Sequence, residues 1–398
     1  MAEKPARRGR VQVPSGKPSP KGRRGAPATR VPPASKPGIE AIRERIDGID
    51  AQLHALIDER ALLARQVGIS KHAEGHTVDF YRPEREAQVL RAAVARNRSR
   101  RGPLRDEEIV RLFREIMSAC LAQQEPLKVA FLGPEGTFTQ QAVLKQFGHS
   151  VRALSLTSIE EVFREVEAGS ADFGVVPIEN SSEGTVNNTL DMFLTSPLCI
   201  CGEVELRIHQ HLLGRMSALD RIERVCAHPQ GLAQCRVWLQ ENLPGAERVP
   251  VSSNAEGARR ARDETGTAAI AGSAAAEVYG LGILVPEIED RHDNTTRFLV
   301  IGRKAFPPSG EDKTTLLVSA AHTDAPGALF RLLEPFAGHQ LSMTRIESRP
   351  SRRRKWDYVF FIDVEGHAAS EPLASALAEV KERASLFRIL GSYPRTVL

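Results

Sequence analysis

The feature that most strongly limits the fold is an apolar stripe through residues 38–71. Its members step by three and four residues, which is the spacing of one face of an α-helix. The stripe therefore predicts a single helix of about nine turns. Such a helix is too long for a compact three-helix monomer, so we expect it to pair with a second copy of the chain. The stripe consists of Ile39, Ile42, Ile46, Ile49, Leu53, Leu56, Leu63 and Val67.

Polar residues interrupt this stripe and two further helical faces. Arg60 replaces one apolar step, and Lys71 is the next step beyond the last apolar residue. A second helix, opening at Pro83, carries Glu86 on its apolar side, and a third ends its stripe on Gln124. Because an unpaired buried cation is costly, the pattern predicts a polar pocket inside a helical bundle. The cations could instead extend to solvent or pair with a glutamate.

Length and composition indicate a multidomain globular protein. A chain of 398 residues suggests about two to four domains, and no apolar run is long enough to span a membrane. The cysteines are odd in number and scattered, so we expect reduced thiols in the cytoplasm, with no disulfide framework and no cysteine metal site. We also expect no cofactor. They are Cys120, Cys199, Cys201, Cys226 and Cys235.

The basic charge belongs to the N-terminal tail. Residues 1–37 are rich in proline and poor in large apolar groups, and residues 1–36 hold ten Lys and Arg against one Glu. Such a segment cannot bury enough surface to offset its ordering entropy, so we expect disorder. Nucleic-acid binding is not expected, because no aromatic residues are interleaved for stacking.

Residues 127–303 alternate short apolar runs with helical patterns, which predicts an α/β fold. One stretch concentrates chemistry: Asp293-Asn-Thr-Thr-Arg-Phe298 leads into the apolar run Phe298–Ile301. A hydroxyl and an arginine therefore lie at the start of a strand, where ligand sites of α/β folds are often found. The alternative is a turn whose Asn and Thr bond their own backbone.

After a linker at residues 304–312, residues 313–398 show the order βαββαβ. This is the order of a ferredoxin-like unit.

Four motifs in order resemble the prephenate dehydratase family with its C-terminal ACT domain. They are Phe131–Phe138, Val176–Ser181, Thr296-Arg297-Phe298 and Glu347–Pro350. Residues 38–125 resemble the all-helical chorismate mutases. Together they resemble the bifunctional enzymes of phenylalanine biosynthesis, which convert chorismate to prephenate and prephenate to phenylpyruvate. The resemblance implies a mutase domain at 38–125, a two-lobed dehydratase domain like solute-binding proteins at 127–303, and an ACT domain at 313–398.

The mutase reaction is an intramolecular rearrangement, so the protein must orient a dianion and stabilise charge on its ether oxygen. The resemblance assigns the substrate carboxylates to Arg60 and to Arg43 of a partner subunit in a homodimer. It assigns the ether oxygen to Lys71 and Gln124. Glu86 would receive the ring hydroxyl, with Arg85 nearby. Arg82 and Cys120 stand where the family can have Asp and Ser.

The dehydratase reaction must assist the departure of hydroxide, and the resemblance places Thr296 there as the catalytic donor. Arg297 either binds a carboxylate or holds the loop. Glu179 and His228 are the ionisable candidates for an acid, although each is more often structural, and Ala227 stands where the family often has Ser. The remaining substrate contacts would be Gly133, Gly136, Thr137, Thr139, Asn180, Ser181, Thr185 and Gln234.

The resemblance also implies an allosteric L-phenylalanine site between ACT domains. It consists of Gly327, Ala328, Leu329, Phe330, Glu347, Ser348, Arg349 and Pro350. The plain alternative is an ordinary helix start and a strand-ending turn. Two other functions stay open: a non-catalytic amino-acid sensor, and a dehydratase whose helical half only dimerises.

Overall fold

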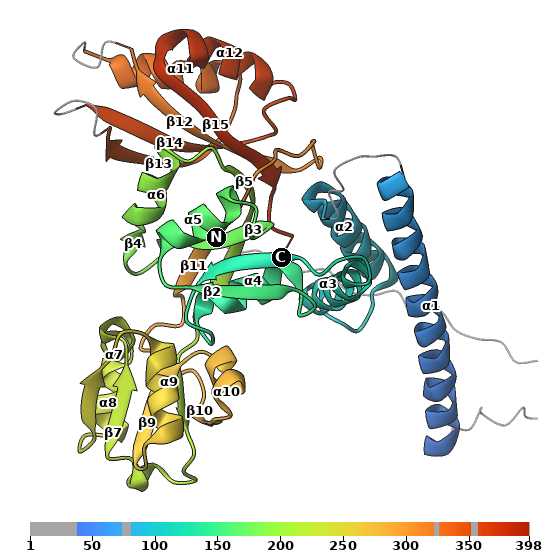
Figure 1. The fold of residues 1–398 in the computed structure, drawn as a ribbon, viewed down its shortest axis with the longest axis vertical. Coiled ribbons are helices and arrows are strands. Elements are labelled where there is room, and N and C mark those ends of the chain that lie inside the picture. The colour runs from blue at the N-terminus through green and yellow to red at the C-terminus, as the bar shows by residue number, and fades with distance from the viewer. Residues whose placement is uncertain (1–37, 74–80, 322–325, 352–356, 398) are drawn as a thin grey trace, which may run out of the picture. The chain divides into compact units, whose positions relative to one another are not determined.

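The computed structural model describes most of the chain (Figure 1). The expected tail, residues 1–37, lies outside the described residues, and so do the side chains of residues 71–73. Residues up to His54 and residues from Ala55 onward form two separate units. The backbone is described for residues 38–73, 81–321, 326–351 and 357–397.

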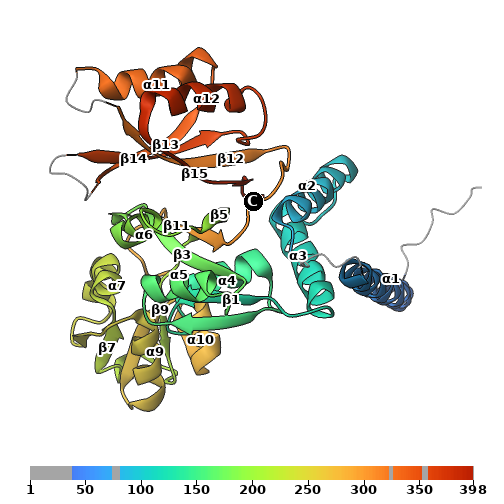
Figure 2. The same ribbon diagram turned by 45° about the horizontal axis from the view of Figure 1, so that its top comes forward.

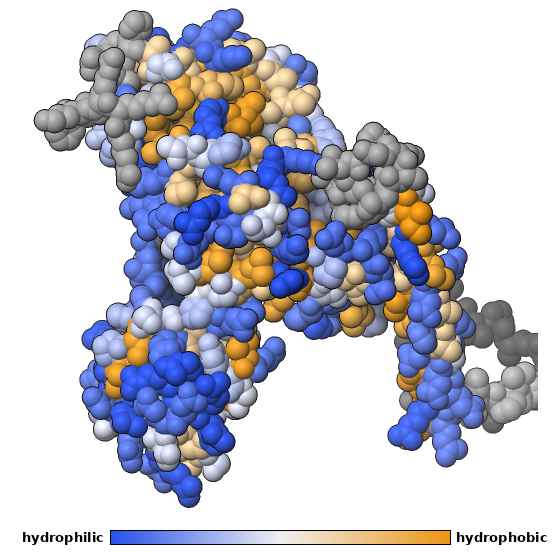
Figure 3. Space-filling view, in the orientation of Figure 1, coloured by the Kyte–Doolittle hydropathy of each residue, from blue (hydrophilic) through white to orange (hydrophobic). Residues whose placement is uncertain are grey.

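The first helix, α1 (Ile39–Ala73), is 35 residues long, which confirms the prediction of one long helix. Its apolar stripe is exposed. Leu56 and Val67, for example, are 61% and 53% exposed, and Figure 3 shows apolar side chains at the surface along this helix. A chain in water gains by burying such a stripe, so α1 presents a face suited to a partner.

Helices α2 (Pro83–Arg100) and α3 (Asp106–Ala122) form an apolar cluster with Leu90, Val94 and Val110. Pro83 stands in the first turn of α2, where its missing N–H leaves no hydrogen bond unmade.

The first lobe of the α/β region is a six-stranded sheet with the order β2-β1-β3-β11-β5, and β4 pairs with β3. The strands β1, β2 and β3 are parallel, whereas β11 runs antiparallel to β3 and β5. The strands are β1 (Lys128–Leu132), β2 (Arg152–Leu156), β3 (Phe173–Asn180), β4 (Gly184–Thr185), β5 (Cys199–Arg207) and β11 (Thr295–Gly302), and the helices are α4 (Phe138–Phe147), α5 (Ile159–Glu167) and α6 (Asn187–Phe193).

The second lobe is a five-stranded sheet with the order β10-β6-β9-β7-β8. The chain enters it after β5 and returns through β11, so two segments join the lobes. This confirms the predicted two-lobed α/β fold. The elements are β6 (His211–Gly214), η1 (Leu219–Arg221), β7 (Arg224–Ala227), α7 (Pro229–Gln234), α8 (Arg236–Asn242), β8 (Glu247–Pro250), α9 (Asn254–Asp263), β9 (Thr267–Ala271), α10 (Ser273–Tyr279) and β10 (Gly282–Val285).

The C-terminal region is a four-stranded antiparallel sheet with the order β13-β14-β12-β15 and two helices on one face (Figure 2). This confirms the ferredoxin-like prediction, although β12 begins inside the expected linker. The elements are β12 (Asp312–Ala320), α11 (Ala328–Gly338), β13 (Met343–Pro350), β14 (Tyr358–Glu365), α12 (Leu373–Arg383) and β15 (Ala384–Pro394).

The other face of this sheet packs on the first lobe. Leu317, Phe361 and Leu390 belong to the same buried cluster as Ile178 and Ile200 of the first lobe. The apolar contact is continuous, so the two regions share one core.

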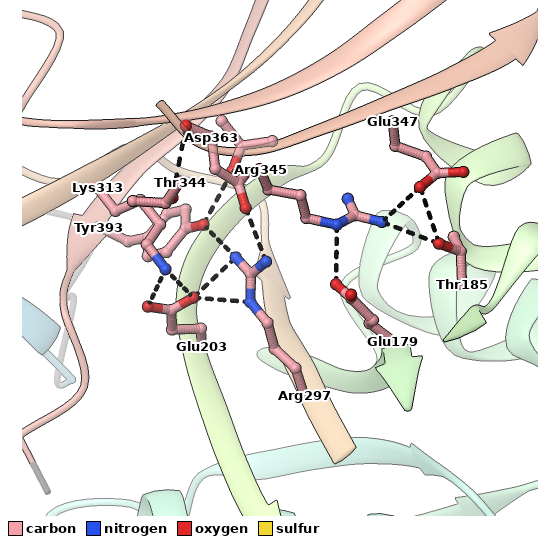
Figure 4. A network of polar contacts seen from close by, with 11 residues as sticks. Glu179, Thr185, Glu203, Arg297, Lys313, Thr344, Arg345, Glu347, Asp363 and Tyr393 are labelled. Carbon is pink, nitrogen blue, oxygen red and sulfur yellow. Dashed lines mark hydrogen bonds and ion pairs between the residues drawn. The ribbon is translucent and has the colours of Figure 1, made fainter. Parts of the chain in front are cut away.

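A buried ion-pair network crosses the same interface (Figure 4). Arg297 of β11 pairs with Glu203 of β5 at 2.8 Å and with Asp363 of β14 at 2.7 Å. Lys313 adds a second cation beside Glu203 at 2.7 Å. Burial, followed by the carboxylates of Asp363 and Glu203, raises the pKa of Tyr393 well above its usual range, so the phenol stays neutral.

The network predicts an unequal response of two β14 carboxylates. Asp363→Asn should lower the free energy of unfolding by roughly 1.5–3 kcal/mol, because Arg297 loses a buried charged partner. Glu365→Gln, whose partner Arg395 is half exposed, should cost less than about 1 kcal/mol. Urea titration measures both, and equal losses would contradict the assignment.

Candidate active sites

The two lobes line one cavity of about 830 Å³. Most of the predicted dehydratase contacts are in its wall, from loops and strand ends far apart in the sequence. The cavity residues among them are Gly133, Gly136, Thr137, Thr139, Asn180, Thr185, Gln234 and Thr296.

Thr296 is fixed at this wall by Asn180. The Asn180 side-chain N–H donates to Thr296 Oγ1 at 2.7 Å and to Asn294 Oδ1 at 3.0 Å. Asn180 Oδ1 accepts the backbone N–H groups of Ser182 and Glu183, which fixes the orientation of the amide. Thr296 Oγ1 is thus an acceptor toward Asn180. Within the described part of the chain no acceptor takes its proton, which is available for a ligand.

The strand register explains why Arg297 does not join Thr296. Successive side chains of a strand point to opposite faces of the sheet. Thr296 faces the cavity, whereas Arg297 faces the ferredoxin-like sheet and is held by Glu203 and Asp363. The contacts of Arg297 therefore do not support its assignment to substrate binding. They agree with the alternative, in which Arg297 holds this part of the chain in place. Ser181 also stays outside the cavity wall and accepts the N–H of Thr295.

The cavity wall contains no Lys or Arg among the described residues. Two longer helices, α4 and α9, begin at the wall instead, after Thr137 and Ser253. Their first N–H groups and the helix dipole favour negative charge. Thr139, in the first turn of α4, is 6% exposed, and its hydroxyl makes no hydrogen bond to another described residue. A small anion could be bound here without a cationic side chain.

Four amide side chains that sequence reasoning did not assign to the site also line the cavity: Asn294, Gln210, Gln230 and Asn254. The Gln210 amide bonds to Gln234 at 3.1 Å and to Asn254 at 3.2 Å. Asn294 could have been found, since it lies in the stretch already singled out. Gln210 and Asn254 carry no local signal, because only the folded second lobe brings them together.

His228 lines the cavity, but its own contacts are structural. Its Nδ1 accepts the N–H of Gln230, and its backbone N–H donates to Asn254. Glu179 is bonded to Arg345 of the ferredoxin-like sheet at 2.9 Å. These contacts therefore do not place His228 or Glu179 as an acid that faces a ligand.

The predicted mutase residues face different neighbours within this one chain. Gln124 donates to the carbonyl of Ala64 at 2.7 Å. Glu86 pairs with Arg114 at 3.2 Å, and burial raises its pKa. Arg85 bonds Gln88 on the surface. The Lys71 side chain lies outside the described residues, Arg43 belongs to the separate unit that ends at His54, and Arg60 is half-buried.

The predicted phenylalanine residues divide between the two faces of β13. Ser348 and Pro350 are exposed, whereas Glu347 and Arg349 face the first lobe. Gly327 begins α11 with a φ of +75°, a conformation that favours glycine, and Leu329 and Phe330 are exposed nearby along that helix.

Within the described residues, no helix is long and apolar enough to cross a bilayer. No group of three or more His, Cys, Asp or Glu side chains in that part of the chain is placed to hold a metal ion.

The chain thus combines a helical region, a two-lobed α/β region with a polar cavity and a ferredoxin-like region. Family models match in the same order: Chorismate mutase type II over residues 42–125, Prephenate dehydratase over 129–306 and ACT domain over 314–382. The resemblance read from the motifs is confirmed.

The chain is 53% identical over 369 residues to the bifunctional chorismate mutase/prephenate dehydratase of Pseudomonas aeruginosa, covering 92% of this chain and 100% of the relative. It is 49% identical over 359 residues to the Neisseria gonorrhoeae protein of the same name, covering 89% and 97%. The structure of an Arthrobacter aurescens prephenate dehydratase in complex with L-Phe matches with 38% identity and a TM-score of 0.62, covering 68% of this chain and 90% of that one. The chain belongs to the bifunctional chorismate mutase/prephenate dehydratase family.

Proposed function

We propose that this protein rearranges chorismate to prephenate and then converts prephenate to phenylpyruvate, carbon dioxide and water. The observation that carries the second activity is the hydroxyl of Thr296, which Asn180 orients in the cavity with its proton available. Incubation of the purified protein with chorismate, with prephenate and phenylpyruvate followed separately, tests both activities.

In the dehydratase cavity the substrate supplies its own electrons. When the ring carboxylate leaves as carbon dioxide, its bonding electrons enter the ring and expel the hydroxyl at the opposite carbon. Thr296 donates a hydrogen bond to that departing oxygen, and the ring becomes aromatic. The other carboxylate of prephenate would lie at the N-terminus of α4, where Thr139 offers a buried hydroxyl.

For the mutase, we propose that two chains complete each site as a homodimer. The supporting observation is the exposed apolar stripe of α1, which a second α1 of the same sequence would cover. Arg43 of the partner chain would then reach a site containing Arg60, Lys71 and Gln124. Gln124 can donate a hydrogen bond to the ether oxygen because an amide donates at any pH. One of its two N–H groups donates to the carbonyl of Ala64, which leaves the other for the substrate.

Two alternatives compete with this function. A non-catalytic sensor would not need an oriented hydroxyl in the cavity, and a purely dimerising helical half would not need Arg60, Lys71 and Gln124. The free thiols of the described residues support a cytoplasmic location.

We further propose that L-phenylalanine binds the ACT domain and inhibits the dehydratase. Gly327 leaves free N–H groups at the start of α11 for a carboxylate, and the exposed Leu329 and Phe330 can contact an aromatic ring. The ammonium would be bound by Ser348 and by backbone oxygens of residues 347–348 on the exposed side of β13, since the Glu347 side chain faces the first lobe.

Ser348→Ala should weaken inhibition by roughly tenfold in phenylalanine concentration, because one hydrogen bond to a charged group is lost. The rate without phenylalanine should not change, since Ser348 does not line the cavity. Calorimetry and inhibition curves measure this, with Ser342→Ala as the matched exposed control. Absence of phenylalanine binding to the unmodified protein would refute the regulatory proposal.

A further inference from the structure

Strand β13 connects the ACT domain to the first lobe through Arg345 and Glu347 (Figure 4). It is an edge strand of its sheet, with Ile346, Ser348 and Pro350 on the exposed side. Arg345 and Glu347 alternate with them and face the first lobe. The strand thus has a free side and a side that contacts the enzyme.

The inward residues of β13 contact three consecutive elements of the first lobe, β3, β4 and α6. Arg345 Nε donates to Glu179 of β3 at 2.9 Å, and Glu347 accepts the hydroxyl of Thr185 in β4 at 3.0 Å. Arg349 donates to Asn187 and Asp191 of α6 at 2.8 Å. The strands β3 and β4 contribute residues to the cavity wall, and α6 follows β4 directly in the chain.

Thr185 is where these contacts reach the substrate. It lines the cavity and is also bonded by two ACT side chains, because Arg345 Nη2 reaches its Oγ1 at 3.4 Å. In the sheet, Thr185 lies opposite Glu179, and the next residue of β3 is Asn180, which orients Thr296. A displacement of β13 would therefore move a wall residue and disturb the strand that holds the catalytic hydroxyl.

We propose that Arg345 and Glu347 are positioning residues that transmit the ligand state of β13 to Thr185. This rests on the proposed inhibition by phenylalanine and specifies its route. A ligand on the exposed side of β13 shifts the strand. Arg345 and Glu347 move with it, and their hydrogen bonds to the Thr185 hydroxyl break or change direction. Coupling requires that the two arrangements of β13 differ in affinity for both ligands.

The test is Arg345→Gln, which removes both donors to the first lobe. Glu179 is 42% exposed, so it is not left as a buried unpaired charge. The matched control is Arg388→Gln. Arg388 of β15 also crosses the interface, but it donates to the carbonyls of Phe193 and Ser196, away from the cavity. Arg345→Lys keeps the charge with fewer donors and should be intermediate.

The measured quantity is the ratio of dehydratase rates without and with saturating phenylalanine, with binding followed by calorimetry. Arg345→Gln should bind phenylalanine as before, while this ratio falls by roughly fivefold or more. Arg388→Gln should resemble the unmodified protein. Unchanged inhibition in Arg345→Gln, or equal losses in both variants, overturns the route while the proposed regulation stands. No phenylalanine binding by the unmodified protein refutes the regulation itself.

Discussion

Replacing Thr296 with Val should lower the dehydratase turnover by about 10²–10³-fold while prephenate still binds. Val has nearly the same shape as Thr but has no hydroxyl, so the departing oxygen loses its donor. Because the lost hydrogen bond strengthens as hydroxide leaves, kcat should fall far more than the affinity for prephenate. Steady-state kinetics gives the turnover, and calorimetry gives binding to the variant.

The adjacent Thr295 provides a matched control. It starts β11 as well, but its side chain is outside the cavity wall, so Thr295→Val should retain near-normal turnover. Near-normal turnover in Thr296→Val would remove this hydroxyl from the mechanism. Equal losses in both variants would indicate damage to the strand.

Gln124→Ala should lower the mutase rate by about 10²–10³-fold and leave the dehydratase nearly unchanged. A single preorganised donor to developing charge accounts for a loss of this size. The dehydratase should keep its rate because Gln124 lies outside the dehydratase cavity. Lys71→Ala should behave alike. Separate assays with chorismate and with prephenate measure the two rates.

Gln123 is an exposed neighbour of the same residue type, and Gln123→Ala should alter neither rate. If Gln124→Ala reduced both activities equally, the assignment of two separate sites would fail.

The periodicity of the sequence predicted the architecture because local patterns carry it. The apolar stripe, with Arg60 at one of its steps, predicted the single long helix α1, and the order of strands and helices predicted the ferredoxin-like sheet. The sequence alone does not determine which face of the sheet Arg297 points to. Neighbouring strand residues point to opposite faces, and only the pairing of β11 with β3 and β5 decides which face lines the cavity.

Sequence reasoning missed some of the cavity residues for a different reason. Gln210 and Asn254 belong to segments of the second lobe that meet only after folding, and neither stands in a motif. For the mutase, the stripe predicted a partner for α1, and the proposed site takes Arg43 from that second chain. Within the single chain, Glu86 pairs with Arg114, and Gln124 donates to the carbonyl of Ala64.

The most direct measurement is to add chorismate to the purified protein and follow prephenate and phenylpyruvate as separate species. We predict that prephenate appears first and that phenylpyruvate follows with no second enzyme added. In the Thr296→Val variant prephenate should accumulate, and in Gln124→Ala added prephenate should still be consumed. If chorismate remains unchanged, or if prephenate accumulates in the unmodified protein without phenylpyruvate, the account of one chain with two activities is contradicted.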